Sequence, residues 1–348
     1  MNVSIIKLVT NLLAALDVRQ RDVIEGRYGL KDGNYKTLAE IGNTCQVTRE
    51  RIRQIEAGAL NALRNAASKN SLSSLIDLVK NHLQNVGGLR REELFLADLK
   101  MMVADGNAPN FGNKVRFLLE VAGEPKFGCE NQSMYNYWYL GEENKKKASA
   151  LIGKLVKLMN SRREQVVNHQ DIDKLFNEAI KPHNLKDLVA LNYISVSKDF
   201  HVNTYGDFGL ANWPEVNPRT VRDWAYLILK KKQKPLHFSD IAGEINKVRK
   251  NSVKLAHIQT VHNELIKDSR FVLVGRGMYG LSEFGLLPGT AREVMARVLK
   301  EHGPLSPEEL LGVVLKERLL KKNTVLINLR NRKYFKRLDD GKYSISSV

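Results

Sequence analysis

Residues 37–64 read TLAEIGNTCQVTRERIRQIEAGALNALR, a pattern of two short helices separated by a turn over residues 44–47. Thr37 and Glu40 have the spacing of a capping box, in which each side chain satisfies a free backbone amide of the first turn. Thr48 can cap the second helix. The apolar residues of that helix follow the helical period: Ile52, Ile55, Ala59, Leu60 and Leu63. The segment therefore predicts two helices packed along one apolar seam.

The opposite face of the second helix carries groups that suit DNA recognition. The polar side chains of its first two turns are Arg49, Glu50, Arg51, Arg53 and Gln54. Arginine can bridge O6 and N7 of guanine, glutamine can pair with adenine, and glutamate can accept from N4 of cytosine, while further arginines hold phosphates. The alternative is a solvated charged face on an amphipathic helix. The short turn ahead of these side chains favours a recognition helix.

The longer segment over residues 19–64 resembles region 4 of the primary sigma factors of the sigma-70 family. RYGL at residues 27–30, TLAEIG at 37–42 and VTRERIRQIEA at 47–57 carry this resemblance. It implies that Arg49, Glu50 and Gln54 face the bases of a promoter −35 element, and that Arg51 and Arg53 contact its phosphates. It also implies contact with the flap of the RNA polymerase beta subunit.

The segment departs from the family pattern at several positions. Gln46 stands where the family usually has Gly or Asp, residues that suit a left-handed turn. Gly58 and Asn61 replace basic residues, Gly58 also weakens the helix interior, and Gly26 interrupts an apolar position. The resemblance covers about residues 10–66, and nothing else in the sequence resembles the sigma region that melts the −10 element. We therefore expect a chain that is not a complete sigma factor.

A short motif recurs four times beyond residue 71, as GLRREEL (88–94), VVNHQDI (166–172), PLHFSDI (235–241) and PLSPEEL (304–310). Copies spaced 78, 69 and 69 residues apart predict small domains of one type. An amphipathic helix precedes each copy, at residues 72–86, 148–161, 220–232 and 291–302. A helix and two aromatic-rich strands follow each copy, with the strands at residues 126–141, 193–210, 271–281 and 334–345. This is the winged-helix order, and we expect the aromatic side chains to pack in cores rather than on bases.

The third copy, over residues 220–285, resembles a HARE-HTH domain, the winged helix also found in the delta subunit of bacterial RNA polymerase. KPLHFSDIA and FVLVGRGMYGL carry the match. A helix over residues 254–267 would occupy the recognition position. Lys254, His257, Gln259 and Thr260 would then reach a groove, with Arg276 at the wing tip on a phosphate or in the minor groove. A solvated wing tip is the alternative.

Two further clusters leave alternatives open. In the last copy, basic and amide side chains surround a third helix over residues 324–329: Lys321, Lys322, Asn323, Arg330, Arg332 and Lys333. They form either a basic recognition helix or a solvated surface. The aromatic run YNYWY at residues 135–139 is either a protein-binding surface or, as we favour, a packed wing strand.

The charge balance indicates a polyanionic partner. The chain has 55 basic and 38 acidic residues, a net charge of +17. Residues 1–70 carry a net +4, residues 217–287 a net +7 and residues 288–348 a net +6, whereas 71–147 and 148–216 are neutral. These five segments are also the predicted domains, with linkers near residues 68–73, 142–147, 212–218 and 286–290. Non-specific affinity for DNA is expected from the basic ends.

Other classes of function find little support in the sequence. No apolar run is long enough for a membrane span. Cys45 and Cys129 have no metal-type spacing, which suits a reduced cytosolic chain. His257 and His262 are five residues apart, and His169 beside Asp171 suits capping better than a metal site. We expect no enzyme, no metal and no cofactor.

The sequence as a whole predicts a mainly α-helical, cytoplasmic, nucleoid-associated protein built from tandem helix-turn-helix and winged-helix domains. The expected function is that of a transcription factor or modulator that reads −35-like duplex DNA and associates with RNA polymerase. One alternative is a DNA-binding regulator without polymerase contact. The other is a scaffold whose neutral middle domains bind proteins while its basic ends hold it on nucleic acid.

Overall fold

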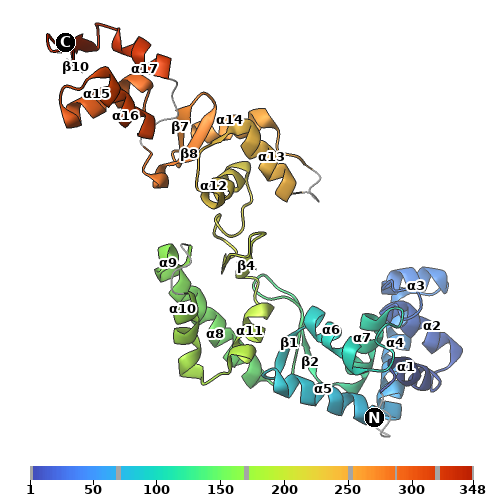
Figure 1. The fold of residues 1–348 in the computed structure, drawn as a ribbon. Coiled ribbons are helices and arrows are strands. Elements are labelled where there is room, and N and C mark those ends of the chain that lie inside the picture. The colour runs from blue at the N-terminus through green and yellow to red at the C-terminus, as the bar shows by residue number, and fades with distance from the viewer. Residues whose placement is uncertain are drawn as a thin grey trace. The chain divides into compact units, whose positions relative to one another are not determined.

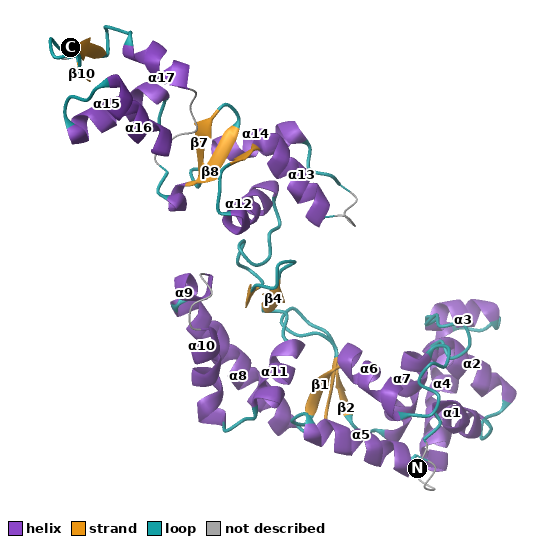
Figure 2. Ribbon diagram, in the orientation of Figure 1, coloured by secondary structure: helices purple, strands orange, loops and turns teal. Residues whose placement is uncertain are grey.

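The computed structural model describes residues 3–67, 72–167, 172–249, 254–286, 288–317 and 322–346. The fold is mainly α-helical with small antiparallel sheets, as predicted (Figures 1 and 2). The chain divides into two compact units, one of residues 1–201 with 209–211 and one of residues 202–208 with 212–348. Each unit is described by itself.

The first unit begins with helices α1 (Ile5–Leu13), α2 (Val18–Tyr28), α3 (Leu38–Thr44) and α4 (Arg49–Ala67). Side-chain caps start each of them. The predicted capping box of α3 is present, because Glu40 accepts from the Thr37 amide at 2.6 Å and Thr37 Oγ1 accepts from the Glu40 amide at 3.2 Å. Thr48 caps α4 by accepting from the Arg51 amide at 3.2 Å. Local sequence therefore fixes where these helices begin.

The next elements are α5 (Ser73–Asn85), β1 (Leu89–Arg91), α6 (Glu92–Met102), α7 (Phe111–Ala122), β2 (Lys126–Gly128) and β3 (Tyr137–Tyr139). This is the predicted winged-helix order, with β3 between β1 and β2 in an antiparallel sheet. Tyr137, Trp138 and Tyr139 are buried, so the aromatic run is a packed wing strand.

The N-terminal helices share one hydrophobic core with this winged helix. Helix α7 packs against α1, α2 and α4. Asp105 caps α1 from the other module, accepting from the Ser4 hydroxyl at 2.8 Å and from the Ile5 and Ile6 amides at 2.9 and 2.8 Å. The predicted domain boundary at residue 70 thus crosses a continuous core, and residues 68–71 of the predicted linker lie outside the described residues. The five-domain division stays a prediction.

The unit continues with α8 (Glu142–Ser161), α9 (Arg163–Val167), α10 (Ile172–Ile180), the 3₁₀ helix η1 (Lys181–His183), α11 (Asp187–Val196), β4 (Phe200–Val202) and β5 (Phe208–Leu210). Two predictions are wrong here. Residues 142–147, expected as a linker, form the first turns of α8 because Glu142 and Glu143 suit a helix N-terminus. Val166 and Val167, expected to start a strand, end α9, and residues 168–171 of that motif, including His169 and Asp171, lie outside the described residues.

The second unit carries two modules. The first has α12 (Val221–Lys232), β6 (Leu236–His237), α13 (Phe238–Val248), α14 (Ile258–Lys267), β7 (Phe271–Gly275), β8 (Met278–Leu281) and the 3₁₀ helix η2 (Ser282–Phe284), with β8 between β6 and β7. The last has α15 (Ala291–His302), α16 (Pro307–Glu317), α17 (Lys322–Leu329), β9 (Phe335–Arg337) and β10 (Tyr343–Ile345). Each module surrounds its own core. The buried rings of Phe271 and Tyr279 confirm the expected packing of wing aromatics.

Loops lie near two of the predicted linkers. Residues 212–218 have no helix or strand, although Trp213 and Val216 are buried. Residues 286 and 288–290 likewise precede α15 without regular structure, and residue 287 is outside the described residues.

Candidate nucleic-acid interface

The exposed face of α4 is the first candidate site. Ile52, Ala59 and Leu63 are buried, and α4 packs on α2 and α3 through Ile52. The five predicted contact residues all lie on the exposed side of its first two turns: Arg49, Glu50, Arg51, Arg53 and Gln54. The structure therefore brings these side chains together, while their contacts with bases and phosphates stay predictions.

Several of these side chains are already paired with one another. The Arg53 guanidinium binds the Glu50 carboxylate through Nη2 at 2.7 Å and Nε at 2.9 Å, and Arg51 Nη1 donates to Gln54 Oε1 at 3.2 Å. The hydrogen bond from Arg53 lowers the pKa of Glu50. Glu50 is thereby held as an ionised acceptor, the form that can receive a hydrogen bond from a cytosine amino group.

The turn before α4 sets the approach of α3 to α4. Gln46 has a φ of 53°, so the position where the sigma family prefers Gly or Asp is indeed left-handed. A Cβ on Gly42 would lie 2.8 Å from the Val47 carbonyl oxygen, which leaves no room for a side chain. The two helices therefore approach closely through Gly42, and Gln46 accepts some backbone strain to close the turn.

Arg27 fixes α4 to the preceding loop. Its Nε donates to Glu56 Oε1 at 3.0 Å and its Nη1 donates to the Lys36 carbonyl at 2.7 Å. This contact holds the base of the recognition helix against the segment that leads into α3. The RYGL motif was singled out from the sequence only as a family motif, and the positioning role of its arginine was missed.

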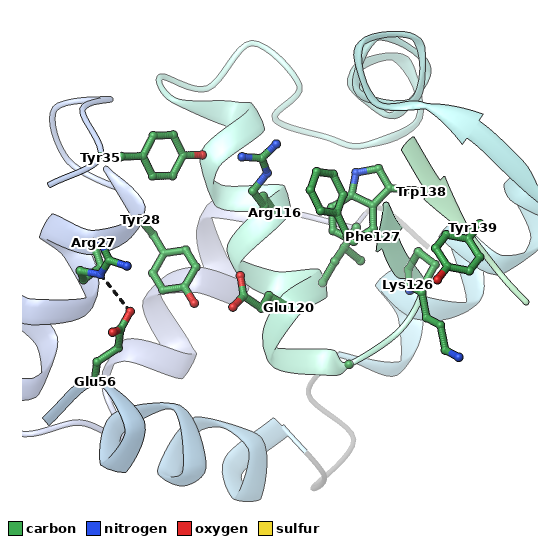
Figure 3. A pocket seen from close by; sticks show the side chains of 13 residues that line it. Arg27, Tyr28, Tyr35, Glu56, Arg116, Glu120, Lys126, Phe127, Trp138 and Tyr139 are labelled. Carbon is green, nitrogen blue, oxygen red and sulfur yellow. Dashed lines mark hydrogen bonds and ion pairs between the residues drawn. The ribbon is translucent and has the colours of Figure 1, made fainter. Parts of the chain in front are cut away.

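A cavity of about 680 Å³ lies between the N-terminal helices and the first winged helix (Figure 3). Arg27, Tyr28 and Glu56 line one side, while Arg116 and Phe127 lie across from them. Its charged groups are largely occupied: Arg116 holds Glu92 with two hydrogen bonds of 2.6 and 2.7 Å from Nη2. Burial and the neighbouring Glu120 raise the pKa of Tyr28. The cavity is a paired, aromatic-walled seam within one unit.

The third helices of the two neutral modules make protein contacts. In a winged helix this helix is the one expected to enter a groove. Helix α7 is instead packed on α1, α2 and α4, and α11 packs on β1 and α8. Asn192 of α11 donates to the Val86 and Leu89 carbonyls at 2.8 and 2.5 Å, and Tyr193 donates to the Gly87 carbonyl at 2.6 Å. Neither helix presents the buried face involved to a duplex.

The recognition helix expected over residues 254–267 is shorter than predicted. Helix α14 begins at Ile258, with His257 as its N-cap and Lys254 ahead of the helix. The reason is tertiary: Asn246 Oδ1 accepts from the Ala256 amide at 2.7 Å, and its Nδ2 donates to the Ala256 carbonyl at 3.1 Å. This clamp holds residue 256 outside the helix.

The exposed face of α14 is only weakly basic. Gln259 and Thr260 are exposed in its first turn, as expected, but Ile258 is 48% and Ile266 62% exposed on the same helix. Arg276 is exposed in the turn between β7 and β8. Among the predicted contacts of this module, Lys254, His257 and Arg276 are all exposed, and their roles in binding stay predictions.

The basic cluster of the last module does not lie on one helix. Lys322 and Asn323 belong to the first turn of α17, whereas Arg330, Arg332 and Lys333 follow its end at Leu329. Lys321 lies outside the described residues. The expected basic recognition helix is therefore replaced by a basic segment that runs from the end of α17 into β9.

The described residues offer neither a metal cluster nor a membrane span. In the described ranges, no group of three or more His, Cys, Asp or Glu side chains could hold a metal ion. Among the described helices, none has both the length and the apolar character that a membrane span requires. Cys45 is half-buried and Cys129 is exposed, each as a free thiol.

Comparison with known proteins agrees with the two resemblances. Residues 12–65 match the family model of sigma-70 region 4, and residues 219–284 match that of HARE-HTH, the ASXL and restriction endonuclease HTH domain. Neither is an enzyme family, and both matches support a DNA-binding, transcription-related role.

The relatives found are sigma factors that share this N-terminal segment. The chain is 58% identical over 62 residues to RNA polymerase sigma factor SigA of Microcystis aeruginosa and to that of Synechocystis sp.. It is 43% identical over 65 residues to RNA polymerase sigma factor sigB of Arabidopsis thaliana. These segments are 18 to 19% of this chain and 15, 14 and 11% of the respective relatives. The chain thus carries a sigma-70 region 4 domain at residues 12–65 and a HARE-HTH winged helix at residues 219–284.

Proposed function

We propose that this protein is a transcription factor or modulator that reads −35-like duplex DNA through α4 and associates with RNA polymerase. The observation that carries the proposal is the exposed face of α4. Arg49, Glu50 and Gln54 lie there on a helix whose opposite side is buried, and their types match the acceptors and donors of base edges. The similarity of residues 12–65 to sigma-70 region 4 supports the same use of these side chains.

The arrangement of the first unit supports a role as a rigid reader. Helix α7 packs on α1, α2 and α4, and Asp105 caps α1, so the first winged helix holds the recognition helix rather than competing for the duplex. Preorganised side chains lose less conformational entropy when they bind. The proposed location is the cytoplasm, on the nucleoid.

The test of base recognition is a comparison of duplexes. Binding of the full chain would be measured on a −35-like duplex and on a scrambled one, for the natural protein and for Arg49→Ala/Gln54→Ala. We expect the variant to lose discrimination, by about 1–3 kcal/mol for each bidentate contact removed. Unchanged discrimination would contradict the proposal and favour the scaffold alternative.

Association with polymerase is tested separately. Tagged full-length protein would be mixed with core RNA polymerase at moderate salt and recovered by affinity. Recovery of stoichiometric polymerase is expected. Its absence, with base discrimination intact, would leave a sequence-specific regulator without polymerase contact. The proposed contact is the flap of the beta subunit, so deletion of the flap tip should abolish recovery.

A further inference from the structure

The last module, which neither family model covers, separates its charges along the sequence. The stretch RNRKYFKR at residues 330–337 contains five cations and no acid: Arg330, Arg332, Lys333, Lys336 and Arg337. The acidic residues of the described part of this module lie mainly in α15 and α16 or at their caps, with Asp339 and Asp340 after β9. We call these five cations the C-terminal basic hairpin. All five are exposed.

A compact turn presents the first three of these cations. Asn331 organises it: its carbonyl accepts from the Phe335 amide at 3.1 Å, and its Oδ1 accepts from the Lys333 amide at 3.2 Å. Phe335 is only 1% exposed and anchors the start of β9 in the core. The backbone that carries the cations is therefore fixed at both sides of the turn.

Strand β9 extends the same positive surface. Lys336 lies opposite Ser344 and Arg337 opposite Tyr343 in the β9–β10 pairing, so both cations have neutral cross-strand neighbours. The Tyr334 ring lies under the Arg292 guanidinium at 4.9 Å and near Lys333 Nζ at 5.8 Å. Cation–π contacts of this kind hold a cation in place without cancelling its charge.

Helix capping explains only part of this surface. Cations near a helix C-terminus interact favourably with its dipole within the last turn. That accounts for Arg330, which directly follows α17, but not for Lys336 and Arg337 on the strand. Five like charges within eight residues repel one another, and a polyanion would relieve that repulsion.

We propose that the C-terminal basic hairpin binds the phosphate backbone of duplex DNA, as a second contact beside α4. The inference rests on the proposed function in taking duplex DNA as the polyanion, but not on which bases α4 reads. Exposed arginines and lysines without base-specific partners contribute sequence-independent affinity that depends on salt. The hairpin thus supplies grip, and α4 supplies choice.

The experiment measures salt dependence with the full chain. Binding to a labelled duplex of scrambled sequence would be followed by anisotropy over a KCl series, for the natural protein and for Arg332→Gln/Lys336→Gln/Arg337→Gln. The matched control is Lys146→Gln/Lys147→Gln/Lys157→Gln, which removes the same net charge from exposed positions of α8. Thermal melting would verify that each variant folds.

The expected result is a flatter salt dependence for the hairpin variant alone. Each phosphate contact contributes about 0.9 to the slope of log K against log salt, so three lost contacts should reduce its magnitude by about 2 to 3. The charge-preserving variant Arg332→Lys/Arg337→Lys should keep the slope. Equal slopes for the hairpin and control variants would overturn the inference. So would a hairpin variant that loses polymerase but not DNA, because the hairpin would then serve an acidic protein surface.

These results are separable from those on α4. The hairpin variant should lower affinity equally for −35-like and scrambled duplexes, whereas Arg49→Ala/Gln54→Ala should change their ratio. Failure of one test therefore leaves the other standing.

Discussion

Arg53 and Glu50 form a two-pronged ion pair on the exposed face of α4, with Nη2 2.7 Å from Oε1 and Nε 2.9 Å from Oε2. The pair joins one residue that we expect on a phosphate to one that we expect on a base. If Arg53 keeps this contact while binding DNA, it orients the Glu50 carboxylate toward the groove. The two predicted roles are then coupled through one guanidinium.

Replacement of Arg53 should weaken binding to all duplexes alike. Arg53→Gln removes one proposed phosphate contact, so the slope of log K against log salt should decrease by about 0.9. The measurement is anisotropy over a KCl series. Arg64→Gln, at an exposed position in the last turn of α4, is the control and should change the slope less. An unchanged slope in Arg53→Gln would argue against its phosphate contact.

The α1 cap should make stability depend on pH. Burial alone would raise the pKa of Asp105, but hydrogen bonds from the Ile6 and Ile5 amides and the Ser4 hydroxyl outweigh it and lower the pKa. A depressed carboxyl pKa contributes stability that is present above the unfolded value of about 3.9 and is lost as pH falls through the folded pKa. Acid should therefore weaken this cap.

Denaturant unfolding of Asp105→Ala tests that cap. We expect the free energy of unfolding to fall by about 1–2 kcal/mol at neutral pH, as for the loss of other N-caps. The difference from the natural protein should shrink below about pH 4. A difference that stays constant down to the acid limit would show that the carboxylate charge is not what stabilises α1.

Two glycines near the recognition helix should respond oppositely to alanine. A Cβ on Gly58, in the exposed interior of α4, would meet nothing within 4 Å, so Gly58→Ala should raise the free energy of unfolding by about 0.5–1 kcal/mol through helix propensity. Gly42→Ala should lower it, because the new Cβ would press on the Val47 carbonyl at 2.8 Å. Thermal melts of both variants provide the comparison, and stabilisation by Gly42→Ala would mean that α3 and α4 approach less closely.

Loss of packing in α7 should destabilise the N-terminal helices as well as the winged helix. Phe117 is fully buried and its ring lies 5.2 Å from that of Tyr28 in α2. Phe117→Ala should cost about 3–5 kcal/mol. Hydrogen exchange should accelerate in α1 and α4 together with α7. Acceleration confined to residues 72–140 would instead mean that the N-terminal helices fold independently.

Local signals in the sequence predicted much of this architecture. The capping box at Thr37, the αL position at Gln46 and the strand–helix starts at residues 88–94, 235–241 and 304–310 depend on neighbouring residues alone. Sequence could not reveal that α7 packs on the N-terminal helices, because an apolar helix face reads the same whichever module covers it. The late start of α14 likewise depends on Asn246, ten residues away from the Ala256 backbone that it binds.

The candidate contact residues were predicted to different degrees. The side chains at residues 49–54 could be placed because helical periodicity separates them from Ile52. Lys336 and Arg337 were missed as part of the basic segment, since attention to a third helix ended the cluster at Lys333. The run RNRKYFKR was the signal that could have included them.

The central claim is that α4 chooses DNA sequence, and a selection of bound duplexes from a random pool tests it most directly. The full chain and Arg49→Ala/Gln54→Ala would be compared under the same salt, because the N-terminal helices share their core with residues 72–140. The account predicts a −35-like motif enriched by the natural protein and lost from the variant. Enrichment of the same motif by both proteins, or of none by the natural protein, would contradict it.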